Sequence, residues 1–393
     1  MIRCLVKLKN MIFYIVLFLL FFICALQDKS INKNYLIGSA PKYNSIQYLI
    51  VFFILLFLGA TRANTVGTDV KGYCNVFNQV TFERINPVYF DFEPGFLYAM
   101  ALFKNIIDED IIFIYFIFIL YFYFNNVFIR KYTIKPTLAL FFIYGLSYYF
   151  FALNGMRQSL CHSLILMYVP LISSTIVSKK KYFFFCLLTI VTALLIQKSQ
   201  SILVLAILPF YFDRFITRKL LTISVVVSLF CGIVLISKVS GFLGSFASYI
   251  NDPRYQNYLL DTNSIGEASN MTLVAHSLYS LLLIYFYKKK GTINKGSLTD
   301  KFCAVGVVGT VVLNLFSPIL WIFQRFADGL FFFRIIPMTN YFYTINNKLE
   351  KRIFQIITIL YVIMRFYGRL LRDSATGSGD VVPYVNNLFN ITM

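Results

Sequence analysis

The chain has 393 residues, of which 59% are hydrophobic and only 13% are charged. A soluble domain normally carries about 25% charged residues, so this composition excludes an ordinary soluble protein and predicts a polytopic membrane protein. The apolar runs are near-continuous and often about 15–20 residues long, without period-two alternation, which favours membrane-spanning helices over a barrel.

The net charge of +19 does not indicate a nucleic-acid partner. The positive charges lie in short clusters between apolar runs, as expected for the cytoplasmic loops of a membrane protein. Membrane lipid and an anionic, lipid-linked substrate are therefore the expected partners. The seven cysteines have no paired spacing and are expected to be small buried hydrophobes, and two histidines are too few for a zinc site. We predict no metal and no cofactor.

The predicted fold is all-α, a single polytopic membrane domain over residues 1–393 with about twelve transmembrane helices. The predicted spans, in chain order, are Met11–Leu26, Ile46–Ala60, Ile111–Ile129, Pro136–Asn154, Met156–Val177, Tyr182–Ile196, Ser199–Phe212, Leu220–Ile236, Met271–Tyr287, Phe302–Phe323, Leu330–Tyr343 and Ile353–Tyr367.

Two larger polar loops interrupt the spans, at residues 61–110 and 238–270. In the first loop, Glu93 and Pro94 open a short apolar helix that ends near Lys104, and proline suits the first turn of a helix. This helix is too short to span easily, so we expect it to be re-entrant or interfacial.

Lysine triplets orient the chain, because positive loops face the cytoplasm. The triplets at 179–181 and 288–290 put the loops at 61–93, 197–198, 238–270 and 324–329 on the outer side of the membrane. The basic residues before Met11 disagree with this orientation. Either the helix at 95–107 spans the membrane, or the N-terminus departs from the rule.

The central feature of the chain is an arginine within an apolar helix. Arg157 lies near the start of the run Phe151–Pro170, and an arginine at a bilayer centre costs about 3 kcal/mol. Gln158 and His162 are four residues apart and share one helical face beside it. We hypothesise that this polar edge binds an anionic substrate, and that His162 is a hydrogen-bonded core residue. The alternative is a structural arginine that pairs with a carboxylate or with carbonyls.

Asp69 and Glu93 are the candidate carboxylates for accepting a proton or a hydrogen bond from a substrate hydroxyl. Each also has a structural explanation: Asp69 can cap the following helix, and Glu93 can be a charge favoured at a helix start. Tyr73 is a candidate for stacking on a sugar ring, or else a packing residue.

A resemblance to a known family rests on short motifs that occur in order along the chain. They are Arg62, Gly67-Thr68-Asp69, Tyr73, Phe77, Glu93-Pro94-Gly95-Phe96, Asn154-Gly155-Met156-Arg157-Gln158, Gln197-Lys198-Ser199, Arg325 and Pro383-Tyr384. This order resembles the EpsG-like polysaccharide proteins, which are similar to the Wzy-type O-antigen and capsule polymerases. Gln197 stands where that family usually has a histidine, so we assign it no proton transfer.

The resemblance implies an enzyme of the bacterial inner membrane that joins undecaprenyl-diphosphate-linked repeat units on the periplasmic face. It implies catalytic roles for Arg157, Asp69 and Glu93, and a chain-length regulator protein as a further partner. The expected substrate-binding residues are Arg62, Tyr73, Gln158, Lys198, Arg325 and Arg254, the last in the loop expected to set repeat-unit specificity. A lipid-linked oligosaccharide flippase, a membrane O-acyltransferase and an O-antigen ligase remain as alternatives.

Overall fold

The structure is a computed structural model of the chain. It describes residues 2–29, 45–85, 90, 92–173, 177–235, 270–289, 298–317, 322–376, 384–386 and 391–392. These residues are almost entirely helical, as predicted for an all-α membrane protein, and they also contain one short two-stranded antiparallel sheet. All but the last residue of the predicted loop at 238–270 lies outside the described residues.

The chain divides into two compact units, residues 1–201 with 362–393, and residues 202–361. The elements of the first unit are α1 (Ile2–Gln27), α2 (Ile46–Ala60), α3 (Val70–Gln79), η2 (Phe82–Arg84), α4 (Pro94–Ile106), α5 (Asp110–Tyr132), α6 (Pro136–Gly145), α7 (Tyr148–Asn154), α8 (Met156–Leu166), α9 (Val169–Ser173), α10 (Lys179–Ile196), β1 (Val385–Asn386) and β2 (Ile391–Thr392).

The second unit contains α11 (Ile207–Tyr211), α12 (Arg218–Leu235), α15 (Asn270–Phe286), α16 (Leu298–Phe316), α17 (Ile322–Phe331), η4 (Phe332–Arg334) and α18 (Ile335–Thr344). Two further elements cross the boundary between the units, η3 (Lys198–Ala206) and α19 (Lys348–Thr376). The expectation of one domain over residues 1–393 stays a prediction.

Three of the described helices are long and apolar enough to cross a membrane, α5, α16 and the Lys348–Ser374 part of α19. A fourth candidate is the pair α6 and α7, which is bent by 59°. The bend lies at Ser147, whose φ of 70° is left-handed and cannot continue a helix. The remaining apolar helices are shorter, so about twelve spans stays a prediction.

Two predicted boundaries were wrong in position. The span predicted at Met156–Val177 is broken, because α8 ends at Leu166 and α9 begins at Val169. The span predicted at Phe302–Phe323 stops at Phe316, two residues before a proline that cannot continue a helix.

Residues 324–329, predicted as a loop, lie inside α17. The polar residues of this segment suggested a loop, yet Ala327 within it and Leu330 directly after it are buried. The segment is an amphipathic helix, with apolar side chains packed on one face.

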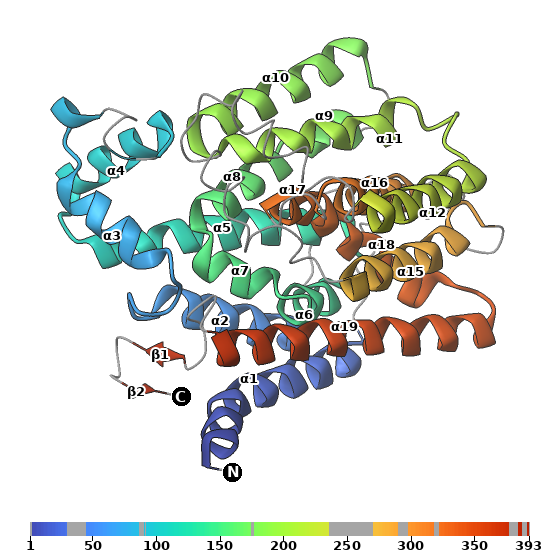
Figure 1. Cartoon of the computed structure of the whole chain (residues 1–393), viewed down its shortest axis with the longest axis horizontal. Helices are drawn as coiled ribbons and strands as arrows, with labels where there is room; N and C mark the ends of the chain where they lie inside the picture. Colours follow the sequence, from blue (N-terminus) through green and yellow to red (C-terminus); the bar gives the residue numbers. More distant parts are fainter. Residues whose placement is uncertain are drawn as a thin grey trace. The chain divides into compact units, whose positions relative to one another are not determined.

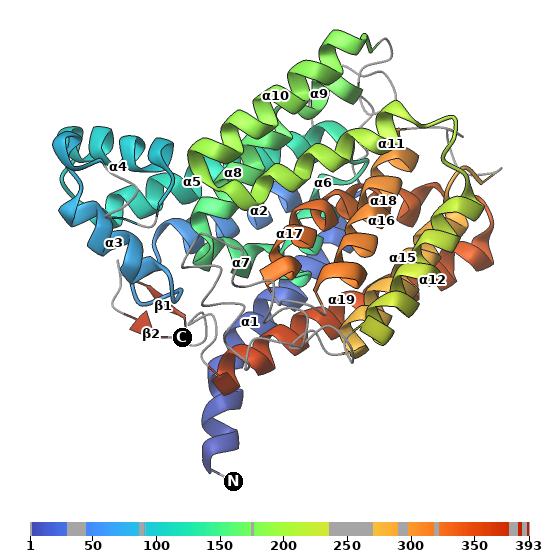
Figure 2. The ribbon, with the colours of Figure 1, turned by 45° about the horizontal axis from the view of Figure 1, so that its top comes forward.

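In the first unit, α5 is the central helix and packs against α2, α3 and α8. The short helices α3 and α4 lie together beside α5 (Figure 1). Their aromatic and aliphatic side chains form one buried cluster with the start of α8, which includes Tyr73, Phe96 and Met156. Helix α10 runs alongside α8 (Figure 2) and also contacts α4. Helices α3 and α4 are therefore packed onto the helices around Arg157.

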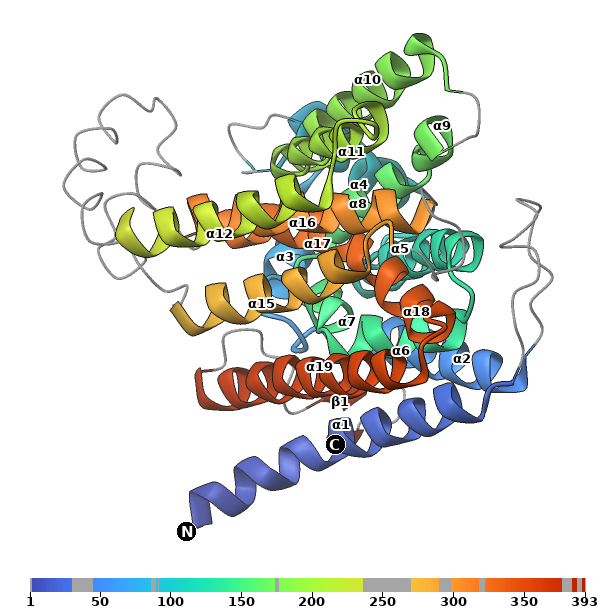
Figure 3. The same cartoon turned by 90° about the vertical axis from the view of Figure 1, so that its right-hand side faces the viewer.

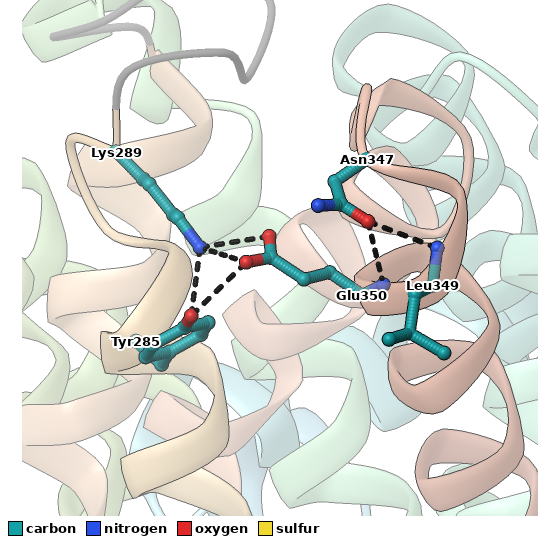
Figure 4. A network of polar contacts seen from close by, with 5 residues as sticks. All are labelled: Tyr285, Lys289, Asn347, Leu349 and Glu350. Carbon is teal, nitrogen blue, oxygen red and sulfur yellow. Dashed lines mark hydrogen bonds and ion pairs between the residues drawn. The ribbon is translucent and has the colours of Figure 1, made fainter.

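In the second unit, α12, α15 and α16 lie side by side (Figure 3). A polar network joins the end of α15 to the start of α19 (Figure 4), where Lys289 Nζ lies 2.7 Å from both carboxylate oxygens of Glu350. Tyr285 Oη donates to the same carboxylate at 3.1 Å, and Asn347 Oδ1 accepts from the first backbone N–H groups of α19. One residue of the predicted cytoplasmic lysine triplet thus has a defined structural partner.

We expect Gly95→Ala to destabilise the first unit. A Cβ at Gly95 would lie 2.7 Å from the carbonyl oxygen of Leu195, where α4 approaches α10, and a backbone atom cannot move aside cheaply. Such overpacking costs about 1–3 kcal/mol. The measurement is the midpoint of thermal unfolding of detergent-purified protein. Gly72→Ala is the matched control, because a Cβ there meets nothing within 4 Å. An equal midpoint for the two variants would contradict this packing.

Candidate functional site

The candidate site lies at the start of α8, directly after a break between two helices. Asn154 ends α7, Gly155 separates the helices and Met156 begins α8. Arg157 is the second residue of α8, and its side chain extends to Glu93, the residue that precedes α4. The break lets the chain turn between α7 and α8 and directs the arginine toward α3 and α4.

Arg157 and Glu93 form a short, largely buried ion pair. Nη1 of Arg157 lies 2.5 Å from Oε2 of Glu93, and the two side chains are 15% and 9% exposed. The second oxygen, Oε1, accepts the backbone N–H of Lys198 at 3.1 Å. Glu93 does not cap α4 with its side chain. The carboxylate therefore holds together three segments, the starts of α4, α8 and η3.

Aromatic rings surround the guanidinium of Arg157. Its Cζ lies 3.9 Å from the ring centroid of Phe92, 5.9 Å from Tyr73 and 6.0 Å from Phe96. A cation over ring faces is attracted by their quadrupole, more strongly when water is excluded. Burial raises the pKa of Tyr73, and the charge of Arg157 next to it offsets part of that rise. Nε of Arg157 has no hydrogen-bond partner among the described residues.

Asp69 stands at the start of α3 and is anchored through its backbone. Asn154 Oδ1 accepts both the backbone N–H of Asp69 and the hydroxyl of Thr68, each at 2.9 Å. The Asp69 side chain is half-buried and makes no capping hydrogen bond to α3. The structural explanation weighed for Asp69, a helix cap, is therefore wrong. Its charge also raises the pKa of the nearby Tyr73.

Gly67 allows these two segments to meet. Its φ is +106°, and a Cβ would lie 2.6 Å from the carbonyl oxygen of Leu153. Only glycine adopts this conformation without strain and also fits so close to another backbone. The turn at 66–69 and the end of α7 are thus brought into contact.

Arg62 is completely buried behind the start of α8. Its Nη1 donates to the carbonyl of Gly59 at 2.8 Å, and its Nη2 lies 2.9 Å from Sδ of Met156. The guanidinium also sits 5.3 Å from the ring centroid of Phe118. Burial lowers the pKa of Arg62 to about 10, which leaves it charged at neutral pH. Arg62 therefore does not lie on an exposed surface. It contacts the site through Met156, the residue that precedes Arg157.

The structure brings together Arg157, Glu93, Tyr73 and the backbone of Lys198, with Asp69 nearby, all in the first unit. The other predicted site residues are placed as follows: Gln158 and His162 are buried on α8, the Lys198 side chain is exposed, Arg325 is half-buried on α17 in the second unit, and Arg254 lies outside the described residues. Within the described ranges, no group of three His, Cys, Asp or Glu side chains is arranged to hold a metal ion.

Comparison with known proteins identifies the family. The model of the EpsG family matches residues 45–386, nearly the whole chain. The chain belongs to the EpsG family. This is a Wzy-like polymerase family, and together with the apolar helices it makes the chain a membrane protein. No curated protein and no solved structure matches the chain. The resemblance inferred from the ordered motifs is therefore confirmed.

Three residues of the EpsG-family chain form part of the site but were not predicted as site residues. Asn154 anchors the turn before α3, Phe92 lies directly against the Arg157 guanidinium, and Met156 links Arg157 to Arg62. Asn154 and Met156 belong to the Asn-Gly-Met-Arg-Gln motif, which was a usable signal. For Phe92, the only signal in the sequence was that it directly precedes Glu93.

We expect Asn154→Ala to destabilise this EpsG-family protein, because it removes the acceptor of two hydrogen bonds and leaves the backbone N–H of the half-buried Asp69 unpaired. The cost is about 1–3 kcal/mol in the free energy of unfolding. Thr68→Ala is the matched control, since it removes only one of the two bonds. Thermal unfolding of the two purified variants measures the difference. Asn154→Ala unfolding at the wild-type temperature would contradict the anchoring role.

Proposed function

We propose that the protein is a polysaccharide polymerase that joins lipid-diphosphate-linked oligosaccharide repeat units. The growing glycan leaves its undecaprenyl-diphosphate carrier and is transferred to a hydroxyl of the next carrier-linked repeat unit. The oxygen of that hydroxyl forms a bond to the anomeric carbon of the donor, while the bond between that carbon and the diphosphate oxygen breaks. The proton of the hydroxyl goes to a base, and undecaprenyl diphosphate leaves. Membership of a Wzy-like polymerase family supports this reaction class.

The observation that carries the proposal is the setting of Arg157. A departing diphosphate needs positive charge, and a guanidinium binds phosphate oxygens through two parallel N–H donors and stays protonated. Glu93 holds one edge of the guanidinium through Nη1. Nε has no partner in the described part of the chain. Nε is itself buried in this conformation, so an anion that gains access to this edge would find an unused donor in an aromatic setting where such stabilisation is strong.

Asp69 is the better candidate for the base. A general base must be able to accept a proton from the attacking hydroxyl. Both oxygens of Glu93 already accept hydrogen bonds, one from Arg157 and one from the backbone of Lys198. The side chain of Asp69 makes no cap, and its backbone is fixed by Asn154. We assign proton transfer to Asp69 and orientation of Arg157 to Glu93.

The buried aromatic residues support the arginine. Tyr73 is only 4% exposed and lies below Arg157, so in this conformation it packs in the site rather than stacking on a sugar. Phe92 is half-buried beside the guanidinium and is the better candidate for contact with the glycan. Arg62 adds positive charge from behind Met156.

The finer assignments follow from the reaction and the charge pattern. We place the protein in the bacterial inner membrane as a multi-pass protein, with the site on the periplasmic side. The loop at 238–270, with Arg254, remains the proposed determinant of repeat-unit specificity, and Gln158, Lys198 and Arg325 remain proposed substrate-binding residues. A chain-length regulator is a proposed partner.

Deletion of the gene tests the reaction class. The readout is the length distribution of surface polysaccharide on a gel. A product with a single repeat supports the polymerase. Loss of all surface repeats indicates a flippase or a ligase instead, and a normal ladder with altered modification indicates an acyltransferase.

We expect Arg157→Lys to abolish the polysaccharide ladder at a normal protein level. Lysine keeps the charge but loses the planar fork, and loss of one such donor typically lowers the rate about 10²- to 10³-fold. The assay is complementation of the deletion strain, with the protein quantified by immunoblot. Arg84→Lys is the matched control, because Arg84 is exposed on η2. A full-length ladder from Arg157→Lys would contradict bidentate binding of the diphosphate by Arg157.

Asp69→Asn and Glu93→Gln separate the two carboxylates. Asp69→Asn should lower kcat about 10²- to 10⁴-fold, the usual contribution of a general base, without lowering the unfolding temperature. Glu93→Gln loses the ion pair with Arg157 and should lower both activity and stability. Repeat-unit polymerisation in isolated membranes and thermal unfolding give the two readouts. Near-wild-type kcat in Asp69→Asn would rule out the assigned base.

A further inference from the structure

The C-terminal segment 384–386 is bound to the segment that follows α2. Tyr384 Oη donates to the carbonyl of Leu58 at 2.5 Å, and Asn386 Nδ2 donates to Thr61 Oγ1 at 2.8 Å. The backbone N–H of Ala63 donates to the carbonyl of Val385 at 3.0 Å. These segments are more than 300 residues apart in the chain, so the contact is a product of tertiary folding alone.

The bound segment is an integral part of the interior of the first unit. Tyr384 and Asn386 are each only 1% exposed. The ring of Tyr384 stacks on Phe13 of α1, with centroids 5.6 Å apart. Residue 386 also forms a backbone bridge with Arg62. Buried side chains with specific hydrogen bonds hold a backbone in one position, since leaving such groups unpaired is costly.

A continuous series of contacts leads from this segment to the site. Residues 384–386 fix Leu58, Thr61 and Ala63, and Arg62 lies between the last two of these. The guanidinium of Arg62 contacts Sδ of Met156 at 2.9 Å. Met156 is the first residue of α8 and precedes Arg157 directly.

We propose that Tyr384 and Asn386 are positioning residues for the Arg157 site. They hold the segment 58–63, and through Arg62 and Met156 they set the placement of the first turn of α8. The consequence for catalysis rests on the proposed function, because it assumes that Arg157 stabilises the departing diphosphate. A displacement of about 1 Å at a reacting group can lower a rate by about a hundredfold.

A cross-linking experiment tests the contact independently of any activity. The double variant Thr61→Cys with Asn386→Cys, in the full-length protein in native membranes, is oxidised and digested, and the peptides are identified by mass spectrometry. We expect a disulfide between the two introduced cysteines. In each single variant, the one introduced cysteine should form no disulfide. Absence of the disulfide in the double variant would overturn the positioning contact.

A kinetic experiment tests the consequence. The substrate is the lipid-linked repeat unit extracted from a strain that lacks this gene, and the rate is expressed per amount of monodisperse purified protein. We expect Asn386→Ala and Tyr384→Phe each to lower kcat by about ten- to hundredfold, with KM changed less than about threefold. Tyr384→Phe keeps the ring packing, so it remains informative if Asn386→Ala fails to fold. Val385→Ala is the matched control, because its hydrogen bond is made by the backbone.

The outcomes separate the two proposals. A wild-type protein that makes no polymer from this lipid contradicts the proposed function. A wild-type protein that polymerises, with kcat unchanged in both Tyr384→Phe and Asn386→Ala, overturns the positioning role. The positioning role is also overturned if the loss of activity is fully explained by loss of folded protein, or if Val385→Ala causes the same loss.

Discussion

The ion pair between Arg157 and Glu93 is the interaction on which the candidate site depends. Taking two charges out of water is expensive, and their attraction offsets this cost only with good geometry and further hydrogen bonds. Here the contact is 2.5 Å, and the second carboxylate oxygen accepts a backbone N–H. The pair fixes the orientation of the guanidinium and leaves its buried Nε without a hydrogen-bond partner among the described residues. It also joins three segments that are distant in the sequence.

Comparison with the other buried arginines clarifies why Arg157 is the one proposed to be functional. Arg334, in the second unit, donates to the carbonyl of Gly306 at 3.1 Å and to the hydroxyl of Ser280 at 2.8 Å, and it also contacts His276. It is an arginine surrounded by neutral acceptors and only 2% exposed. Arg62 is likewise buried against a carbonyl and a thioether. Arg157 is the most exposed of the three, and it lies against the half-buried Phe92.

The site is assembled by backbone features as much as by charged side chains. The positive φ of Gly67 and the amide of Asn154 hold the start of α3 against the end of α7. The break after α7 then gives Arg157 a direction that a continuous helix from Tyr148 to Leu166 would not provide. The C-terminal segment supports the same region from behind, through Arg62. A small number of contacts to the backbone within the first unit therefore controls the position of the Arg157 side chain.

The sequence by itself determined the membrane class, most helix positions and the family. Long apolar runs and clustered lysines reflect the membrane around the chain, and the ordered motifs can be recognised without knowledge of the fold. The candidate residues for the chemistry, Arg157, Glu93 and Asp69, were also proposed from the sequence and stay proposals. Only the tertiary structure decided that Glu93 is the partner of Arg157, that Asp69 caps no helix, and that Arg62 is buried. The segment 324–329 showed a related limit, because its polar residues suggested a loop while packing made it a helix. Spacing along the chain describes neighbours within one helix, whereas these roles depend on which distant segments come within hydrogen-bond distance.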